Sequence, residues 1–305
     1  MKKYLVIALL WATIVIHAQD FQGMAVYESK TSTKEFSSNF AGNREITPEM
    51  QKNIEERMKK MFEKTYILNF DRSSSIYKEE EKIESDAQGG GGGFRMMGSM
   101  MGAGGTYHKD VKKQQYTVDK EFFGKEFLVQ DSLPKYNWVM GTETKKIGEY
   151  TCFKATAVVK NSESDFRNFR PRNNDKKKEE VEAKEKTEVV KDSTQNKKTN
   201  FTDNWEIPKE KTITAWYCPE IPINQGPEGY WGLPGLILEV NDEKTIILCS
   251  KLVLNSKDKV EIKAPKNGKL VTQKEFDETV KAKMEEMREM RGGQGGRSVE
   301  IRMGR

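Results

Sequence analysis

The chemically most distinctive residues of this chain are four closely spaced methionines. Met96, Met97, Met100 and Met101 form the pattern MMxxMM, and His108 follows seven residues later. Thioether sulfurs are soft ligands that suit Cu(I), and a flexible loop could close several of them around one ion. Methionines also provide an adaptable apolar surface, which is the alternative that needs no metal. A Cu(I) site at these residues is therefore one functional hypothesis.

Residues for acid–base or nucleophilic catalysis are scarce. Removal of the N-terminal segment described below leaves His108 as the only histidine, and it borders the glycine-rich segment without the supporting context that a Ser-His-Asp or Cys-His arrangement needs. The chain has no GxSxG, P-loop, HExxH or CxxC motif. Its many carboxylates lie in Lys/Glu mixtures, which are typical of solvated surfaces. We therefore expect no enzymatic activity and no bound cofactor other than the Cu(I) alternative.

A second candidate site is the aromatic and proline-rich segment 216–240, which reads WYCPEIPINQGPEGYWGLPGLILEV. Four of its aromatic side chains are candidates for contact with a partner or ligand: Trp216, Tyr217, Tyr230 and Trp231. They can line a groove, or they can simply cover the end of a sheet. Without a polar catalytic partner in the segment, we favour the covering role.

The same segment contains a predicted structural turn, formed by Leu233, Pro234, Gly235 and Leu236. Proline at the second position and glycine at the third fit a type II turn, in which the glycine takes a positive φ. The apolar alternation that follows predicts a strand with one buried side. We interpret the segment as a rigid corner of the fold, with Gly235 at positive φ.

The pattern of the remaining chain predicts a mainly β scaffold of the α+β class, in a single domain. Short β-type runs separated by turn signals recur from 21–29 to 245–254, which is typical of a curved antiparallel sheet. A helix with one apolar stripe is predicted after the first strand, over about 47–62. Thr272 and Glu275 predict a capping box before a C-terminal helix that ends near Arg291.

Several segments are not expected to join this domain. Residues 1–18 have the layout of a secretory signal peptide, with Lys2 and Lys3, a short apolar core and Ala18 before the cleavage point. The domain then covers 19–291, with flexible inserts at 88–105 and 161–204 and a disordered tail at 292–305. The first insert is rich in glycine and methionine, and the second has 11 basic and 10 acidic residues among its 44. Neither can bury enough apolar surface to offset its ordering entropy.

Composition excludes some partners. Without Lys2 and Lys3, 50 basic residues oppose 47 acidic ones, so the net charge of the mature chain is +3. This even balance predicts no general attraction to nucleic acid. No apolar run after the signal peptide is long enough to cross a bilayer. We therefore expect an exported, soluble protein.

Three cysteines lie in this exported chain, at positions 152, 218 and 249. They predict either one disulfide and one free thiol, or three small buried apolar residues. The sequence alone does not determine which two cysteines would form the disulfide.

The segment 232–239 also carries a resemblance to a known family. Gly232 to Ile237 spell GLPGLI, and the preceding TAWY, PEIP and GP elements of 214–227 are similar to the central block of the GLPGLI family of exported proteins of Gram-negative bacteria. Upstream, Trp138, ETK at 143–145 and IGEYTC at 147–152 resemble its earlier strands. The two inserts depart from the family pattern.

The resemblance implies a cell-envelope role without an established activity, and it supplies no catalytic residues. Family members are associated with envelope proteins such as TonB-dependent outer-membrane receptors. The alignment of neighbouring strands that the resemblance implies suggests a Cys152–Cys218 disulfide. We therefore predict a non-catalytic periplasmic or outer-membrane-associated accessory or binding protein. The alternatives are the Cu(I)-binding protein and a carrier that holds an apolar ligand inside the curved sheet.

Overall fold

The computed structural model describes residues 21–32, 62–80, 105–161, 209–256 and 260–293, the short pieces 170–171 and 205–206, and isolated positions between 47 and 59. The signal segment, most of the helix predicted after the first strand, most of both inserts and 294–305 lie outside the described residues. Those predictions therefore stay predictions. Among the described residues, no helix is both long and apolar enough to cross a membrane.

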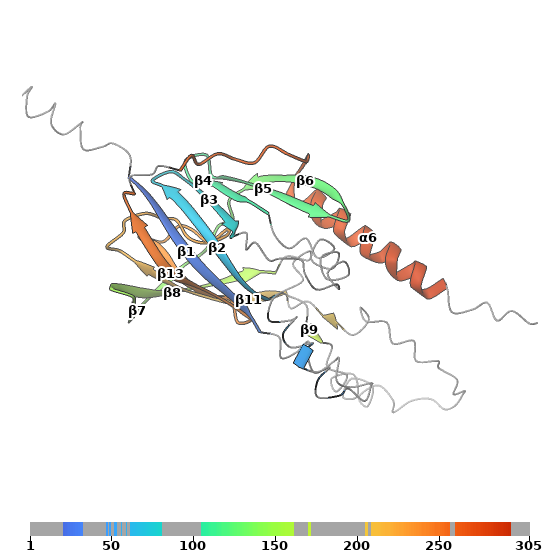
Figure 1. Cartoon of the computed structure of the whole chain (residues 1–305), viewed down its shortest axis with the longest axis horizontal. Coiled ribbons are helices and arrows are strands. Elements are labelled where there is room, and N and C mark those ends of the chain that lie inside the picture. Colours follow the sequence, from blue (N-terminus) through green and yellow to red (C-terminus); the bar gives the residue numbers. More distant parts are fainter. Residues whose placement is uncertain are drawn as a thin grey trace, which may run out of the picture.

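The protein is built on one open sheet of twelve strands, and a helix follows the last strand in the chain (Figure 1). The strand order is β14-β6-β5-β4-β3-β2-β1-β13-β12-β11-β8-β7. The strands are β1 Gln22–Thr31, β2 Glu63–Asp71, β3 Ser74–Glu79, β4 Tyr107–Asp110, β5 Gln115–Phe122, β6 Lys125–Ser132, β7 Val139–Ile147, β8 Tyr150–Lys160, β11 Glu210–Cys218, β12 Leu236–Asn241, β13 Thr245–Leu254 and β14 Lys269–Val271. A separate two-stranded sheet pairs β9 (Arg170–Pro171) with β10 (Trp205–Glu206).

The predicted mainly β class is confirmed, with one difference in strand direction. All neighbours in the large sheet run antiparallel except β14 and β6, which run parallel, so the sheet is mixed. A parallel pair needs a long crossover connection rather than a hairpin. β6 and β14 are far apart in the chain, and β14 reaches the edge of the sheet only after β13, which lies in its middle.

The C-terminal helix α6 (Gln273–Gly293) begins at the predicted capping box. The amide and hydroxyl of Thr272 donate to a carboxylate oxygen of Glu275 at 2.7 and 3.0 Å, and the amide of Glu275 donates back to the Thr272 hydroxyl at 3.2 Å. These reciprocal bonds occupy amide groups that the first helical turn cannot satisfy. Phe276 is buried against Phe122 and Phe127, which attaches the start of α6 to the β5–β6 hairpin.

The sheet curves around its largest apolar cluster. β3 and β12 are four strand spacings apart, about 19 Å along a flat sheet. A single residue nevertheless joins them: the Gln225 carbonyl accepts from the Ile237 amide at 3.0 Å, and its side-chain oxygen accepts from the Ser75 hydroxyl at 2.9 Å. Tyr27 of β1 likewise reaches across β13 and donates to the Ile237 carbonyl at 2.7 Å. We call the enclosed side the inner face and the opposite side the outer face.

Candidate functional site

The connection between β11 and β12, residues 219–235, lies against the inner face of the sheet. Ile221, Ile223 and Leu233 are buried there in one cluster with residues of β1, β2 and β11. The connection also bonds to its own ends, since Leu236 donates to the Ile221 carbonyl at 2.9 Å and Gly232 to the Asn224 carbonyl at 3.2 Å. These side chains fill part of the inner face, the side on which the carrier hypothesis places its ligand.

The predicted type II turn at Gly235 is wrong. The φ of Gly235 lies outside the left-handed region, where Gly232 lies at +92°. The Gly235 amide donates to the Leu233 carbonyl at 2.8 Å, which is the hydrogen bond of a γ-turn centred on Pro234. Glycine is needed at 235 for a different reason: an added Cβ would lie 2.2 Å from the carbonyl oxygen of Cys218.

The four candidate aromatic residues do not form one groove. Tyr217 and Tyr230 are buried, with Tyr230 stacked at a tilt on Tyr136 at 5.7 Å between ring centroids. Trp231 is half-buried in the second apolar cluster, and its indole donates to the Pro134 carbonyl at 2.7 Å. Tyr230 and Trp231 therefore attach the connection to the fold, whereas Tyr217 lies on β11 and contacts Phe153 and Met140.

Trp216 lies apart from the other three, on the outer face. Lys145 of β7 places its ammonium 5.5 Å from the centre of the Trp216 ring and pairs with Glu239 of β12. On the same face, Lys154 pairs with Glu143 at 2.8 Å. Cation–π contact and ion pairing thus attach the edge strand β7 to the outer face of the sheet.

A fully buried lysine, which the sequence pattern did not reveal, lies beneath the connection. The ammonium of Lys109 on β4 donates to the carbonyl oxygens of Gly226 and Tyr230, the latter at 2.9 Å. Burial lowers the pKa of Lys109 to about 7, against a weaker opposing effect of the Glu228 charge. Within the described residues no carboxylate forms an ion pair with Lys109, and its hydrogen bonds hold the 226–230 part of the connection against β4.

Ser75 of β3 lies opposite Lys109 in the sheet. A serine and a lysine side by side could in principle act as nucleophile and base. The Ser75 hydroxyl donates to Gln225 instead, and Lys109 donates only to the two carbonyls. Neither side chain is exposed to solvent. A nucleophile needs access to a substrate, and both members of this pair are fully buried.

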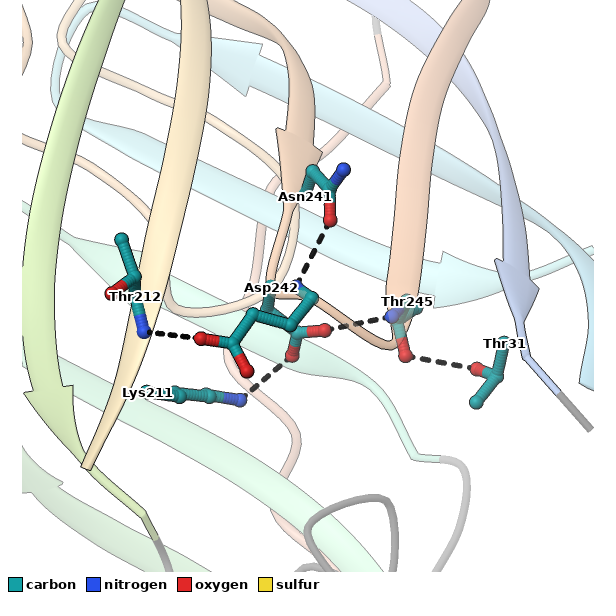
Figure 2. Close-up of polar contacts among 7 residues, drawn as sticks. Thr31, Lys211, Thr212, Asn241, Asp242 and Thr245 are labelled. Carbon is teal, nitrogen blue, oxygen red and sulfur yellow. Dashed lines mark hydrogen bonds and ion pairs between the residues drawn. The ribbon is translucent and has the colours of Figure 1, made fainter. Parts of the chain in front are cut away.

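A second polar network surrounds the turn between β12 and β13, at the ends of these strands away from the 219–235 connection (Figure 2). The side chain of Asp242 accepts from the ammonium of Lys211 at 2.7 Å and from the Thr245 amide at 2.8 Å. Both charged side chains are nearly inaccessible to solvent. Thr245 also bonds to Thr31 of β1 at 2.9 Å between hydroxyl oxygens, so the network joins β11, the β12–β13 turn and β1.

Of the predicted copper ligands, the four methionines lie outside the described residues. His108 is half-buried on β4, and burial lowers its pKa. No group of three or more His, Cys, Asp or Glu side chains suited to a metal ion occurs in the part of the chain that the structure describes. The Cu(I) site therefore stays a prediction.

The three cysteines are free thiols in the structure. Tyr217 pairs with Phe153 across β11 and β8, so the next positions in this register are Cys218 and Cys152. Both are buried, and proximity to Cys218, after burial itself, raises the pKa of Cys152 to about 12. The strands thus bring the predicted partners to neighbouring positions, while the disulfide stays a prediction.

Comparisons with known proteins identify no activity. A family described as "Protein of unknown function (Porph_ging)" matches residues 138–239, which cover β7, β8, β11, the 219–235 connection and most of β12. This match covers less than half of the chain, and it is consistent with a GLPGLI-type family without confirming that name. No curated protein matches the chain.

Two solved structures are similar over 86% of this chain, and each is matched over 33% of its own length. They are described as "Structure of PNGF-II in C2 space group" and "Structure of PNGF-II in P21 space group", with 11% and 10% identity and TM-scores of 0.42 and 0.43. This protein therefore spans about a third of their length, and the likeness is too low to support a functional argument. What the comparisons do show is that the chain is similar, from Trp138 to Glu239, to a family of uncharacterised proteins.

Proposed function

We propose that this protein is a non-catalytic accessory or binding protein of the cell envelope, exported by its N-terminal signal peptide. Its partner would be an envelope protein, and the family resemblance suggests a TonB-dependent outer-membrane receptor. The contact would use the outer face of the sheet between β7 and β13 rather than the 219–235 connection, because most side chains of that connection are occupied in holding the fold.

One observation carries this proposal. Seven large apolar side chains are exposed among the described residues, and five of them lie on β7, β8 and β13: Val139, Met140, Val158, Ile246 and Leu248. Single exposed apolar residues are ordinary, but their concentration on one part of a sheet is typical of an interaction surface.

The register places most of these side chains in two adjacent rows on the outer face. Val139 pairs with Thr156, and the same row continues through Thr214 and Asn241 to Ile246. The next row runs from Lys154 through Trp216 and Glu239 to Leu248. Cross-strand neighbours share a face, so the two rows form a continuous surface of apolar, threonine and paired charged side chains.

The proposal is tested by photo-crosslinking in the native organism, with the reactive amino acid placed at Val158 or at Leu270. The two positions are matched, with 62% and 61% exposure, but Leu270 lies on β14 at the far edge of the sheet. We expect Val158 to crosslink one defined envelope protein and Leu270 not to do so. Equal labelling at both positions, or no adduct at Val158, would overturn the proposed surface.

Export is tested separately, by fractionation of the cells and mass spectrometry of the mature N-terminus. We expect the protein in the periplasmic or outer-membrane fraction, beginning at Gln19. A cytoplasmic protein that begins at Met1 would contradict the envelope assignment.

A further inference from the structure

The edge strand β7 differs from the other edge of the sheet in length and in exposure. β14 has three residues, whereas β7 has nine, of which Val139 to Lys146 are consecutively exposed. Within the described part of the chain, β7 pairs only with β8. The other side of the strand therefore presents unpaired amide and carbonyl groups, which can add a further strand.

Edge strands are usually protected against indiscriminate pairing, and β7 carries two such features. A bulge between Met140 and Thr144 interrupts its ladder with β8. Charged residues follow at Glu143, Lys145 and Lys146. Charges on an edge disfavour most partners, but their order also selects the partner that complements it.

We propose that β7 is a dimer edge, at which two copies of the chain pair antiparallel about Thr144 and join their sheets. In a two-fold antiparallel pair, each residue lies opposite the residue equally far on the other side of the centre. With Thr144 at the centre, Glu143 of each copy lies opposite Lys145 of the other. Centres at 143, 145 or 146 place like charges opposite each other, which is unfavourable.

The charged side chains are already held in position for this pairing. Glu143 contacts Lys154, and Lys145 contacts Glu239, so both lie on the outer face. The dimer would therefore extend two ion pairs into a chain of four alternating charges: Lys154 and Glu143 from one copy, then Lys145 and Glu239 from the other. The two-fold axis produces this chain twice, and networks of this kind contribute more than isolated surface pairs.

This dimer is independent of the proposed envelope partner. It uses the free edge of β7 and leaves the outer-face rows between β8 and β13 uncovered. A short strand pair buries little area, so we expect a weak dimer with a Kd in the micromolar range.

The test uses the purified mature chain in sedimentation velocity and multi-angle light scattering. At about 100 µM, far above a micromolar Kd, the wild type is expected to be a dimer. Glu143→Lys and Lys145→Glu should each weaken the dimer at least about tenfold, because each places like charges opposite at both symmetric positions. Lys146→Glu is the matched control: residue 146 lies opposite Thr142, so the dimer should persist.

Mixing the two variants gives the decisive result. Glu143→Lys presents two positive side chains and Lys145→Glu two negative ones, so an equimolar mixture should form a heterodimer at about 1 µM total protein, a concentration at which each variant alone is mostly monomeric. Circular dichroism establishes that each variant is folded. If Lys145→Glu is not folded, the comparison of Glu143→Lys with the wild type still tests the proposal. A wild type that is monomeric at about 100 µM would overturn the proposal. So would a dimer that Glu143→Lys leaves as tight as that of Lys146→Glu.

Discussion

The 219–235 connection and the edge strand β7 both lie within residues 138–239, the range that matches the family, but their physical environments are opposite. The connection is buried against the inner face and held by Lys109, Gln225 and the indole of Trp231. β7 has eight consecutive exposed residues and is attached through ion pairs that remain partly open to solvent. One region is thus part of the packed interior, and the other is exposed to solvent.

This contrast changes the meaning of the most distinctive sequence in the chain. The GLPGLI segment is a candidate functional loop by its composition, yet Gly235 and both leucines are used in packing. Residues on which the family resemblance rests also contact one another, as Lys145 does with Trp216 and with Glu239. A signature can therefore record how a fold is closed without marking where it acts.

The largest expected effect is that of Gly235→Ala. Its methyl group would lie within 2.2 Å of the Cys218 carbonyl oxygen, so the main chain of β11 or β12 must move. We expect a loss of at least about 3 kcal/mol in the free energy of unfolding, measured by urea denaturation. Gly232→Ala is the control, because that position has a positive φ but only one atom nearby, 3.8 Å away.

Gly232→Ala should cost only about 1–2 kcal/mol, which is the usual penalty for a left-handed alanine. If the two variants are equally destabilised, close approach of the main chain does not explain Gly235.

The second largest effect is expected at Lys211, whose partner Asp242 is almost inaccessible to solvent. Lys211→Met leaves a buried carboxylate without its cation, but that carboxylate keeps the Thr245 amide as a donor, so we expect a loss of no more than about 3 kcal/mol, the lower end for a broken buried pair. Lys30→Met is the exposed comparison, since the Lys30–Glu63 pair has a lysine side chain that is 73% exposed. That variant should change stability by less than about 1 kcal/mol. A similar loss in both would remove the distinction between the buried network and the surface pairs.

The third prediction concerns Lys109, the buried lysine that has no carboxylate partner. Lys109→Met should cost about 2 kcal/mol, because the carbonyls of Gly226 and Tyr230 lose their donor. The cost should depend on pH. The folded-state pKa, about 7, lies below that of an unfolded lysine, so between about pH 7 and 10 the unfolded state binds more protons and the wild type gains stability as pH rises.

The gain is at most about 1.4 kcal/mol per pH unit and should be absent from the variant. Burial also raises the pKa of Cys152 and of Cys249, which lowers stability above about pH 8.5. Both cysteines are present in both proteins, so the difference between the two pH profiles isolates Lys109. Parallel profiles from pH 7 to 9 would show that the amine does not titrate in the folded state.

Local patterns in the sequence were sufficient for the elements but not for the buried polar residues. The capping box at Thr272 and Glu275 depends only on neighbours in the chain, and it is confirmed. The role of Gly235 depends on Cys218, and that of Lys109 on carbonyls more than 110 residues away. Such contacts exist only after the sheet has curved, so the periodicity of apolar residues in the sequence cannot predict them.

The smallest effects are expected on β7 itself. Glu143→Gln removes an ion pair whose carboxylate is 64% exposed, so it should change the free energy of unfolding by less than about 0.5 kcal/mol. Lys145→Met should cost somewhat more, about 0.5–1 kcal/mol, because Glu239 is only 8% exposed and loses its cation. Chemical denaturation of both variants beside Lys109→Met gives the ranking. If Glu143→Gln destabilised the protein as much as Lys109→Met, β7 would be part of the structural core. Its exposed charges would then be needed for stability rather than available for a partner.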